Sequence, residues 1–159
     1  FLAAALFQSM AGVKLTDVPY KGAAQPLADL IGGQFDMYFG GIASAAPFIR
    51  SGRLRALAVT TLKRSTMLPD VPTLDESGLS GFDISTWFGI LAPVGTPADI
   101  VNKLNAAMVN AIAASSVKDT LLAVGLIPES STPGQFAELI KNEIRKFAVI
   151  VKNSGAKFN

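Results

Sequence analysis

The chain has 159 residues, 50% of them hydrophobic, and a formal net charge of +2. This length suits one ordinary domain or two small lobes, and the apolar content is ample for a core. Lys and Arg are dispersed, without a basic run or stripe, so we expect no nucleic-acid partner.

Cysteine and histidine are both absent. This excludes disulfides, thiolate and imidazole metal sites, and Cys–His or Ser–His nucleophile systems. Most hydrolytic and metal-dependent chemistry is excluded with them.

The mean hydropathy of +0.40 is high, yet the longest uncharged stretch covers only 15 residues, 84–98, and 37–49 covers 13. A membrane-spanning helix needs about 20, so none is predicted. The first seven residues have a helical pattern without a cap or a basic leader region, and we expect a fragment that begins inside a helix rather than a signal peptide.

In the first sixty residues, apolar periodicity predicts alternating helices and strands. The predicted order is a helix over 2–10 that ends at Gly12, a strand over 13–20, a helix over 24–31, a strand over 35–39, a helix over 45–51 that begins near Ala43 or Ser44, and a strand over 54–60. Such strand–helix units indicate an α/β fold with a parallel-rich sheet flanked by helices.

The remainder is predicted to be mostly helical after an irregular stretch. Residues 63–82 are rich in Pro and Gly around a short helical piece at 73–77, and 84–92 is extended. A helix over 97–113 has Thr96 as its N-cap and Pro97 as its first residue. Its predicted buried stripe is Ile100, Val101, Leu104, Met108, Val109 and Ile112. A helix over 117–124, a strand over 126–129 and a helix from Thr132-Pro133 to near Gly155 complete the chain.

Two predicted strand–helix turns have the composition of an anion-binding site. The first is VPYKGA (18–23), where free helix-initial N–H groups, the Lys21 ammonium and the open backbone of Gly22 come together. The second is Gly40-Gly41 with Ser44. Turns at the carboxyl ends of parallel strands open on one sheet edge, so we expect both to face one crevice, which Thr86 and Trp87 could line.

Each of these features also has a plain structural interpretation. Lys21 could be a solvated surface charge, Trp87 and Tyr20 could be core residues, and the Gly40-Gly41 pair could only allow tight packing between strand and helix. Taken singly they are weak signals of a binding site, and together they are moderate.

The sequence resembles the tripartite tricarboxylate transporter substrate-binding receptors, the Bug-type periplasmic proteins. The segments that carry the resemblance, in chain order, are VPYKG (18–22), DLIGGQFD (29–36), SGRLRALAVT (51–60), LPDVPT (68–73) and WFGILAP (87–93) with GTP (95–97). The resemblance covers essentially the whole chain but only the C-terminal half of the family pattern.

The resemblance implies a fold of the periplasmic-binding-protein type II kind, with one complete lobe and the C-terminal helical part of the other. Residues 1–83 would form the second ligand-binding lobe, 84–92 the hinge strand, and 93–159 the segment that completes the first lobe. Ligand-binding residues carried over by the resemblance are Tyr20, Lys21, Gly22, Ala23, Gly40, Gly41, Ser44, Thr86 and Trp87.

The resemblance also implies a function, that of a periplasmic receptor which delivers a small di- or tricarboxylate, or a related organic acid, to membrane transporter components. Family receptors for acidic amino acids tend to carry Asp where Gly40 stands, which favours an acid without an amine. Phe48 stands where His is frequent, which would alter the pocket edge. The resemblance implies binding rather than turnover, so we predict a protein that is not an enzyme and that uses no metal or cofactor.

Two other functions stay open at this point. An effector-binding domain of a transcriptional regulator shares the general fold, and an enzyme would have to rely on a pair such as Ser44 and Lys21. For the isolated chain we expect weak or absent ligand binding. We also expect exposed apolar faces on the helices over 97–113 and 132–152, which favour self-association.

Overall fold

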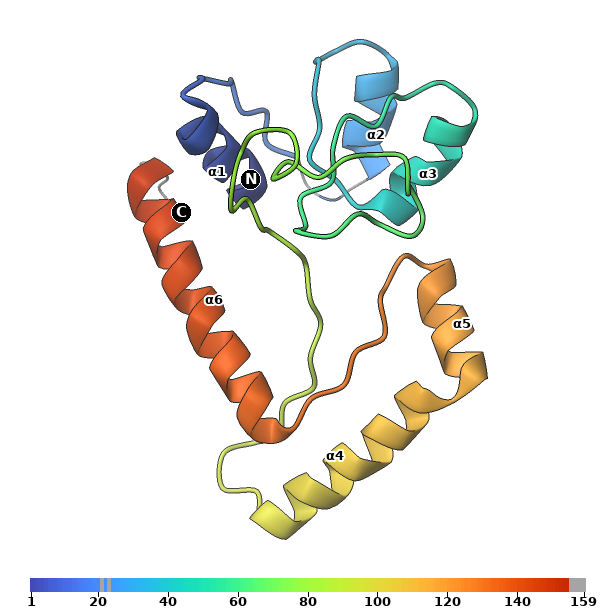
Figure 1. Ribbon diagram of the computed structural model, residues 1–159, viewed down its shortest axis with the longest axis vertical. Coiled ribbons are helices and arrows are strands. Elements are labelled where there is room, and N and C mark those ends of the chain that lie inside the picture. Colours follow the sequence, from blue (N-terminus) through green and yellow to red (C-terminus); the bar gives the residue numbers. More distant parts are fainter. Residues whose placement is uncertain (21, 23, 155–159) are drawn as a thin grey trace. The chain divides into compact units, whose positions relative to one another are not determined.

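A computed structural model describes residues 1–20, 22 and 24–154 of the chain (Figure 1). Its regular elements are six helices: α1 (Leu2–Ala11), α2 (Ala24–Ile31), α3 (Ile42–Arg50), α4 (Ala98–Ala113), α5 (Ser115–Ala123) and α6 (Pro133–Ser154). All six lie where apolar periodicity predicts a helix.

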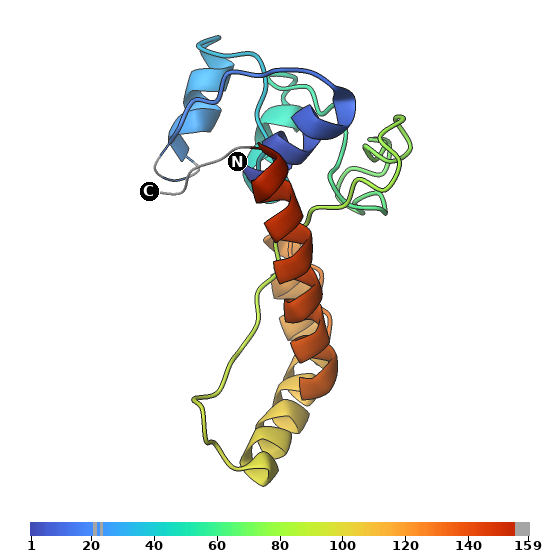
Figure 2. The ribbon, with the colours of Figure 1, turned by 90° about the vertical axis from the view of Figure 1, so that its left-hand side faces the viewer.

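The chain divides into two compact units, one made of Phe1–Ser85 with Val149–Asn159 and the other of Thr86–Ala148. The first unit holds α1 to α3, and the second holds α4, α5 and most of α6, which is one unbroken helix of 22 residues (Figure 2). The division falls close to the predicted start of the hinge strand. The lobe assignments of 1–83, 84–92 and 93–159 stay a prediction.

Several helix ends match their sequence signals. Gly12 caps α1 in the left-handed conformation (φ 66°), and its N–H bonds to the carbonyl of Gln8, as predicted. At the start of α6, Thr132 and Gln135 form a reciprocal capping box. The Thr132 amide donates to Gln135 Oε1 at 2.9 Å, and the Gln135 amide donates to Thr132 Oγ1 at 3.2 Å.

Two helix starts were predicted wrongly. Helix α3 begins at Ile42 rather than at Ala45, with Gly41 as its N-cap, and Ser44 lies in its first turn as predicted. Helix α4 begins at Ala98 with Pro97 as N-cap, and the Thr96 hydroxyl donates instead to the carbonyl of Pro93 at 2.8 Å. In both cases the hydroxyl near the helix start donates to a backbone carbonyl that precedes it in the chain. Residue preference alone does not reveal this hydrogen bond.

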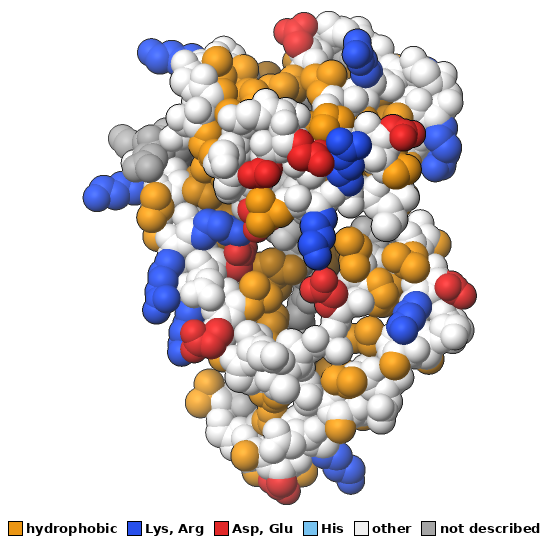
Figure 3. Space-filling view, viewed as in Figure 1, with side chains coloured by type: hydrophobic (Ala, Val, Ile, Leu, Met, Phe, Trp, Pro, Cys, Tyr) orange, Lys and Arg blue, Asp and Glu red, His pale blue; other side chains and the backbone are white. Residues whose placement is uncertain are grey.

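The apolar stripe predicted to be buried on α4 is not buried, since no residue of this helix is. Ile100 is 43% and Leu104 is 46% exposed, and on α6 Ile144 is 63% exposed. The expectation of exposed apolar faces on these two helices is therefore confirmed. Figure 3 shows hydrophobic side chains at the surface over the parts labelled α4 and α5 in Figure 1.

The predicted strands over 13–20, 35–39, 54–60 and 126–129 do not form a ladder within the described residues. The pairing found there is a single parallel bridge between Val59 and Thr73. Alternating apolar residues favour an extended backbone, but a strand also needs a partner that takes up its N–H and C=O groups. Apart from Val59 and Thr60, the residues of these predicted strands have no ladder partner in the described part of the chain.

The bridge lies in the best-buried cluster of the first unit. Val59 donates its amide to the carbonyl of Pro72 at 2.8 Å and accepts from the Leu74 amide at 3.0 Å. Phe82 is completely buried, and Thr73 is 1% exposed. These contacts tie the predicted strand over 54–60 to the turns that follow it.

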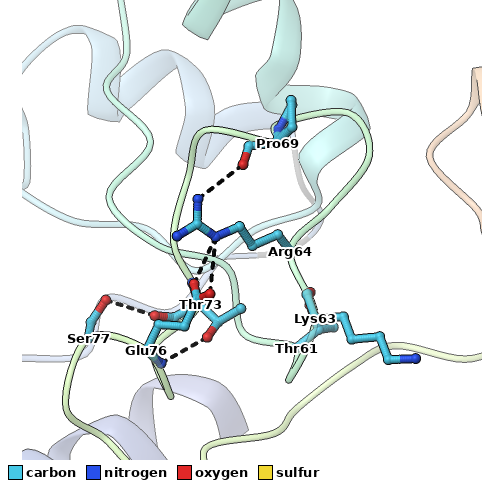
Figure 4. Close-up of polar contacts among 7 residues, drawn as sticks. All are labelled: Thr61, Lys63, Arg64, Pro69, Thr73, Glu76 and Ser77. Atoms are coloured by element: carbon cyan, nitrogen blue, oxygen red, sulfur yellow. Dashed lines mark hydrogen bonds and ion pairs between the residues drawn. The ribbon is translucent and has the colours of Figure 1, made fainter.

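Thr73 and Glu76 form a capping box where a short helical piece was predicted, although the residues there adopt turns (Figure 4). The Thr73 amide donates to Glu76 Oε2 at 2.8 Å, and the Glu76 amide donates to Thr73 Oγ1 at 2.9 Å. Arg64 Nε also donates to Glu76 Oε2, at 2.9 Å, and Arg64 Nη1 donates to the Pro69 carbonyl at 3.2 Å. The Glu76 carboxylate thus connects Thr73 to Arg64, and Arg64 in turn holds the carbonyl of Pro69.

Replacing Thr73 by Ala should lower the free energy of unfolding by about 1 kcal/mol, because it removes the acceptor for the Glu76 amide. Chemical denaturation followed by circular dichroism at pH 7 measures this loss. The substitution Ser116→Ala, at an exposed position of α5, is the control and should change stability much less. Equal stability of Thr73→Ala and the parent chain would contradict the proposed role of the box.

Because of Glu76, the free energy of unfolding should decrease at acidic pH. The backbone hydrogen bond from Thr73, followed by the hydrogen bond from Arg64, lowers the pKa of Glu76 below its ordinary value. The stabilisation is complete above the unfolded pKa of about 4.3 and is lost as the pH falls through the lowered folded pKa. Denaturation midpoints between pH 7 and pH 3 should therefore vary less in Glu76→Gln than in the parent chain, and equal variation would contradict this role of Glu76.

Candidate functional site

An open hollow of about 600 Å³ lies between α2 and α3 in the first unit. Its lining comes from both helices and from the turn after α3: Ala24, Leu27, Ala28, Ile31, Ser44, Phe48 and Arg53. The two helices are neighbours in Figure 1. The hollow therefore brings the first residue of α2 close to the first turn of α3, which are parts of the two predicted anion-binding turns.

The N-terminus of α3 offers free backbone donors. Gly41 has φ −70° and ψ 133°, and no side chain caps the helix. The amides of Ile42, Ala43 and Ser44 donate no hydrogen bond to any described residue. Three unpaired N–H groups at the positive end of the helix dipole are the arrangement that stabilises an anion.

Ser44 contributes to this turn through its backbone more than through its hydroxyl. Its Oγ donates to the carbonyl of Gly41 at 2.8 Å, so its proton is already used. The oxygen keeps lone pairs that accept hydrogen bonds, and the side chain reaches the hollow. A hydroxyl bonded in this way is not activated as a nucleophile.

Gly40 is required by its neighbour Tyr38. A Cβ atom at position 40 would collide with Cε1 of the Tyr38 ring. The ring therefore packs directly against the backbone before α3, and it fills the space in which a side chain at position 40 would begin.

The first predicted turn is described in part, because Lys21 and Ala23 lie outside the described residues. Tyr20 donates its hydroxyl proton to Asp29 Oδ2 at 2.8 Å, and its ring centroid lies 5.8 Å from that of Phe35. The hydrogen bond to Asp29, burial and the nearby negative charge raise the pKa of Tyr20. These contacts favour a role in positioning α2 against the preceding segment.

Gly22 has a φ of 95°, a conformation that a residue with a side chain adopts only with strain. The helix that follows offers fewer donors than α3, because its third residue is Pro26, which has no N–H. Among the described residues, the predicted anion-binding turn at α3 therefore has more free backbone N–H groups than the turn at α2.

Thr86 and Trp87 belong to the second unit and do not line the hollow. The Trp87 ring packs edge-on against Phe136 of α6, with centroids 5.5 Å apart and planes at 89°. Thr86 is exposed and has no hydrogen-bond partner among the described residues.

Sequence reasoning named Phe48 at the pocket edge but missed Arg53 and its contact with Phe48 in the hollow. The Arg53 guanidinium carbon lies 5.7 Å from the centre of the Phe48 ring, within the range of a cation–π contact. The spacing of Ser44 and Phe48 by four residues places them on one helix face and was available as a signal. Arg53 follows a turn at the end of α3, and helical periodicity does not reach it.

Within the described residues, no group of His, Cys, Asp and Glu is arranged to hold a metal ion. Likewise, none of the described helices is both long and apolar enough to cross a membrane.

Comparison with known proteins identifies relatives along the whole chain. The family model for the tripartite tricarboxylate transporter family receptor matches residues 1–156. A UPF0065 protein from the tcbD–tcbE intergenic region of Pseudomonas sp. (strain P51) is 40% identical over 151 residues, which cover 94% of this chain and 45% of that protein. A UPF0065 protein of Pseudomonas knackmussii is 39% identical and is covered to 89%.

Solved structures of similar sequence have the same backbone. Rpa4515 of R. palustris, solved with adipate, is 34% identical with a TM-score of 0.83, and the match covers 97% of this chain and 52% of that one. The periplasmic binding protein BugD is 33% identical with a TM-score of 0.79, covering 98% and 53%. MatC from Rhodopseudomonas palustris, solved with malate, is 36% identical with a TM-score of 0.75, covering 94% and 52%.

These matches confirm both the family resemblance and the fold class. The chain spans about half the length of the solved receptors, and the matched part is their C-terminal half. Apart from the bridge between Val59 and Thr73, the predicted strands lack pairing in the described residues, yet the backbone follows the path of a periplasmic solute-binding protein. The chain belongs to the tripartite tricarboxylate transporter receptor family.

Proposed function

We propose that this chain forms part of a periplasmic receptor that binds a small di- or tricarboxylate, or a related organic acid, and delivers it to the membrane components of a tripartite transporter. The family match to solute-binding receptors supports the binding role. The structures with adipate and malate, at 34% and 36% identity, support a carboxylate as the ligand class.

The observation that carries the proposal is the free N-terminus of α3 beside the hollow. A carboxylate placed there accepts hydrogen bonds from backbone N–H groups, which no side chain competes for in the described residues. Apolar side chains such as Leu27 and Ile31 line the same hollow and suit the hydrocarbon part of an organic acid. The remaining predicted contacts, Tyr20, Lys21, Gly22, Ala23, Gly40, Gly41, Thr86 and Trp87, stay part of this proposal.

Gly40 supports an acid without an amine. An acidic side chain at this position would pair with a ligand ammonium, but Tyr38 fills the space in which that side chain would begin. The proposed ligand class is therefore closer to adipate or malate than to aspartate or glutamate.

The two other functions receive less support. The family match covers residues 1–156 and is to transporter receptors rather than to regulators. An enzyme built on Ser44 would need its hydroxyl proton directed to a base, whereas this proton is donated to the Gly41 carbonyl.

The α3 amides should respond to an added dicarboxylate. In NMR titrations of the ¹⁵N-labelled chain with adipate or malate, we expect the largest shifts at Ile42, Ala43 and Ser44. Adipamide, which has the same carbon skeleton but no charge, should leave them in place. Equal responses to adipate and adipamide would contradict an anion site at this helix end.

Replacing Ile42 by Pro should weaken dicarboxylate binding about tenfold or more, the effect of losing one hydrogen bond to a charged group. Pro is tolerated at the first helical position, and Gly41 already has the extended backbone that precedes Pro. The same NMR titration measures the change, with Ile42→Ala as the matched control because it keeps the N–H. Equal affinities of the two variants would contradict the assigned role of this amide.

The isolated chain should bind adipate, malate or citrate more weakly than micromolar in calorimetric titrations. It aligns with about half of each ligand-bound structure, so it supplies only part of the contacts to a bound acid. Micromolar affinity of the isolated chain would contradict this expectation.

A further inference from the structure

Arg53 is the one charged residue among the described residues that line the hollow between α2 and α3. Apart from Ser44, the other side chains of this lining are apolar. The function proposed above uses the free amides in the first turn of α3 and gives this cation no role. A single guanidinium beside an apolar lining is a site for a second negative charge on the ligand.

The turn after α3 fixes the position of Arg53. Gly52 has a φ of 72°, and its amide donates to the Ile49 carbonyl at 3.1 Å. The amides of Arg53 and Leu54 both donate to the Phe48 carbonyl, at 2.9 and 3.1 Å. The Arg53 guanidinium carbon also lies 5.7 Å from the centre of the Phe48 ring. Backbone and side chain are therefore both held against Phe48, which lowers the entropy cost of ordering this side chain on a ligand.

The Arg53 guanidinium forms no ion pair and donates no hydrogen bond among the residues that the structure describes. A guanidinium has five N–H donors in a planar fork, and this fork matches the two oxygens of a carboxylate. The Phe48 ring provides no oxygen acceptor, so the donors stay available to a bound acid.

The separation between Arg53 and the start of α3 limits the length of such an acid. Ser44 lies in the first turn, and Phe48 follows four residues later, a rise of about 6 Å along the helix axis. The guanidinium beside the Phe48 ring is thus about one helical turn away from the free amides. An extended dicarboxylate with four methylene groups, such as adipate, spans a separation of this size. A dicarboxylate with two methylene groups, such as succinate, is shorter than this separation.

The lining between these two positions suits an unsubstituted hydrocarbon chain. Leu27, Ala28 and Ile31 of α2 contribute apolar side chains, and no described acidic residue lines the hollow. Methylene groups gain free energy when they leave water for such a surface, whereas hydroxyl groups on the same carbons would lose hydrogen bonds.

We infer that Arg53 binds the second carboxylate of a straight-chain dicarboxylate whose first carboxylate lies at the start of α3. This inference rests on the proposed function and narrows its ligand class to acids with about four methylene groups between the carboxylates. The amides of α3 bind any carboxylate, so Arg53 is the specificity-determining residue that separates these acids from monocarboxylates and from shorter dicarboxylates.

NMR titrations of the ¹⁵N-labelled chain with adipate and with hexanoate test this role. Hexanoate has the same six-carbon chain but a single carboxylate, and the method measures affinities in the millimolar range. We expect adipate to bind about tenfold more tightly, about twofold from its two equivalent carboxylates and about fivefold from an ion pair with an exposed guanidinium. Arg53→Gln should reduce this ratio to about two. Arg55→Gln should keep it, because Arg55 is exposed but does not line the hollow.

Two further measurements separate ligand binding from a structural effect of the substitution. Succinate should bind the parent chain and Arg53→Gln equally, because it does not reach position 53. In the parent chain, the Arg53 Nε–H signal should shift with adipate and stay in place with hexanoate, a readout that needs no variant.

The outcomes distinguish this inference from the function on which it rests. A tenfold preference for adipate that survives Arg53→Gln, or an Arg53 Nε–H signal that does not respond to adipate, would overturn the inference. If the α3 amides still respond to adipate in that case, the proposed function stands. If the α3 amides respond to neither acid, both the proposed function and the role of Arg53 fail.

Discussion

The hydrogen bonds of Val59 with Pro72 and Leu74 are the constraint on which the first unit depends. They join an apolar segment, which follows α3, to a stretch rich in turns that has no regular structure of its own. A third bond, from the Ile84 amide to the Thr60 carbonyl at 2.8 Å, returns the chain to the same place. The paths of all three segments are therefore fixed relative to one another.

The polar contacts around Thr73 explain why this bridge can lie in a buried position. Thr73 is almost fully buried, yet its amide, hydroxyl and carbonyl all have partners, since the Ser77 hydroxyl donates to the carbonyl at 2.7 Å. A buried polar residue costs stability only when its groups are left unpaired. The box of Thr73 and Glu76 therefore lets a loop-rich segment contribute to the core.

Local and long-range interactions account for what the sequence could predict about the fold. A helix satisfies its own backbone, so the apolar spacing of α4 and the pair of Thr132 and Pro133 at α6 were sufficient to place these elements. The strand over 54–60 depends on Thr73, a residue far along the chain, and the other predicted strands depend on partners that the described residues do not supply. Periodicity indicates which backbone is extended, but it does not identify the partner of that backbone.

At the candidate site, too, the sequence predicted local features but not the contacts that depend on packing. The glycine pair before α3 indicated a helix start with open backbone, and the structure has free amides there. The sequence did not reveal that the Ser44 hydroxyl turns back to Gly41, because this depends on where the helix begins. Phe48 and Arg53 meet in the hollow through a turn whose path is set by packing, so their pairing was not available from spacing alone.

The contact between Trp87 and Phe136 has a consequence for spectroscopy. Trp87 is the only tryptophan in the chain, and it is 38% exposed although its ring packs against Phe136. Its emission wavelength and its accessibility to quenchers therefore report the solvation of the segment around position 87, undiluted by other indoles. No extrinsic label is needed to observe it.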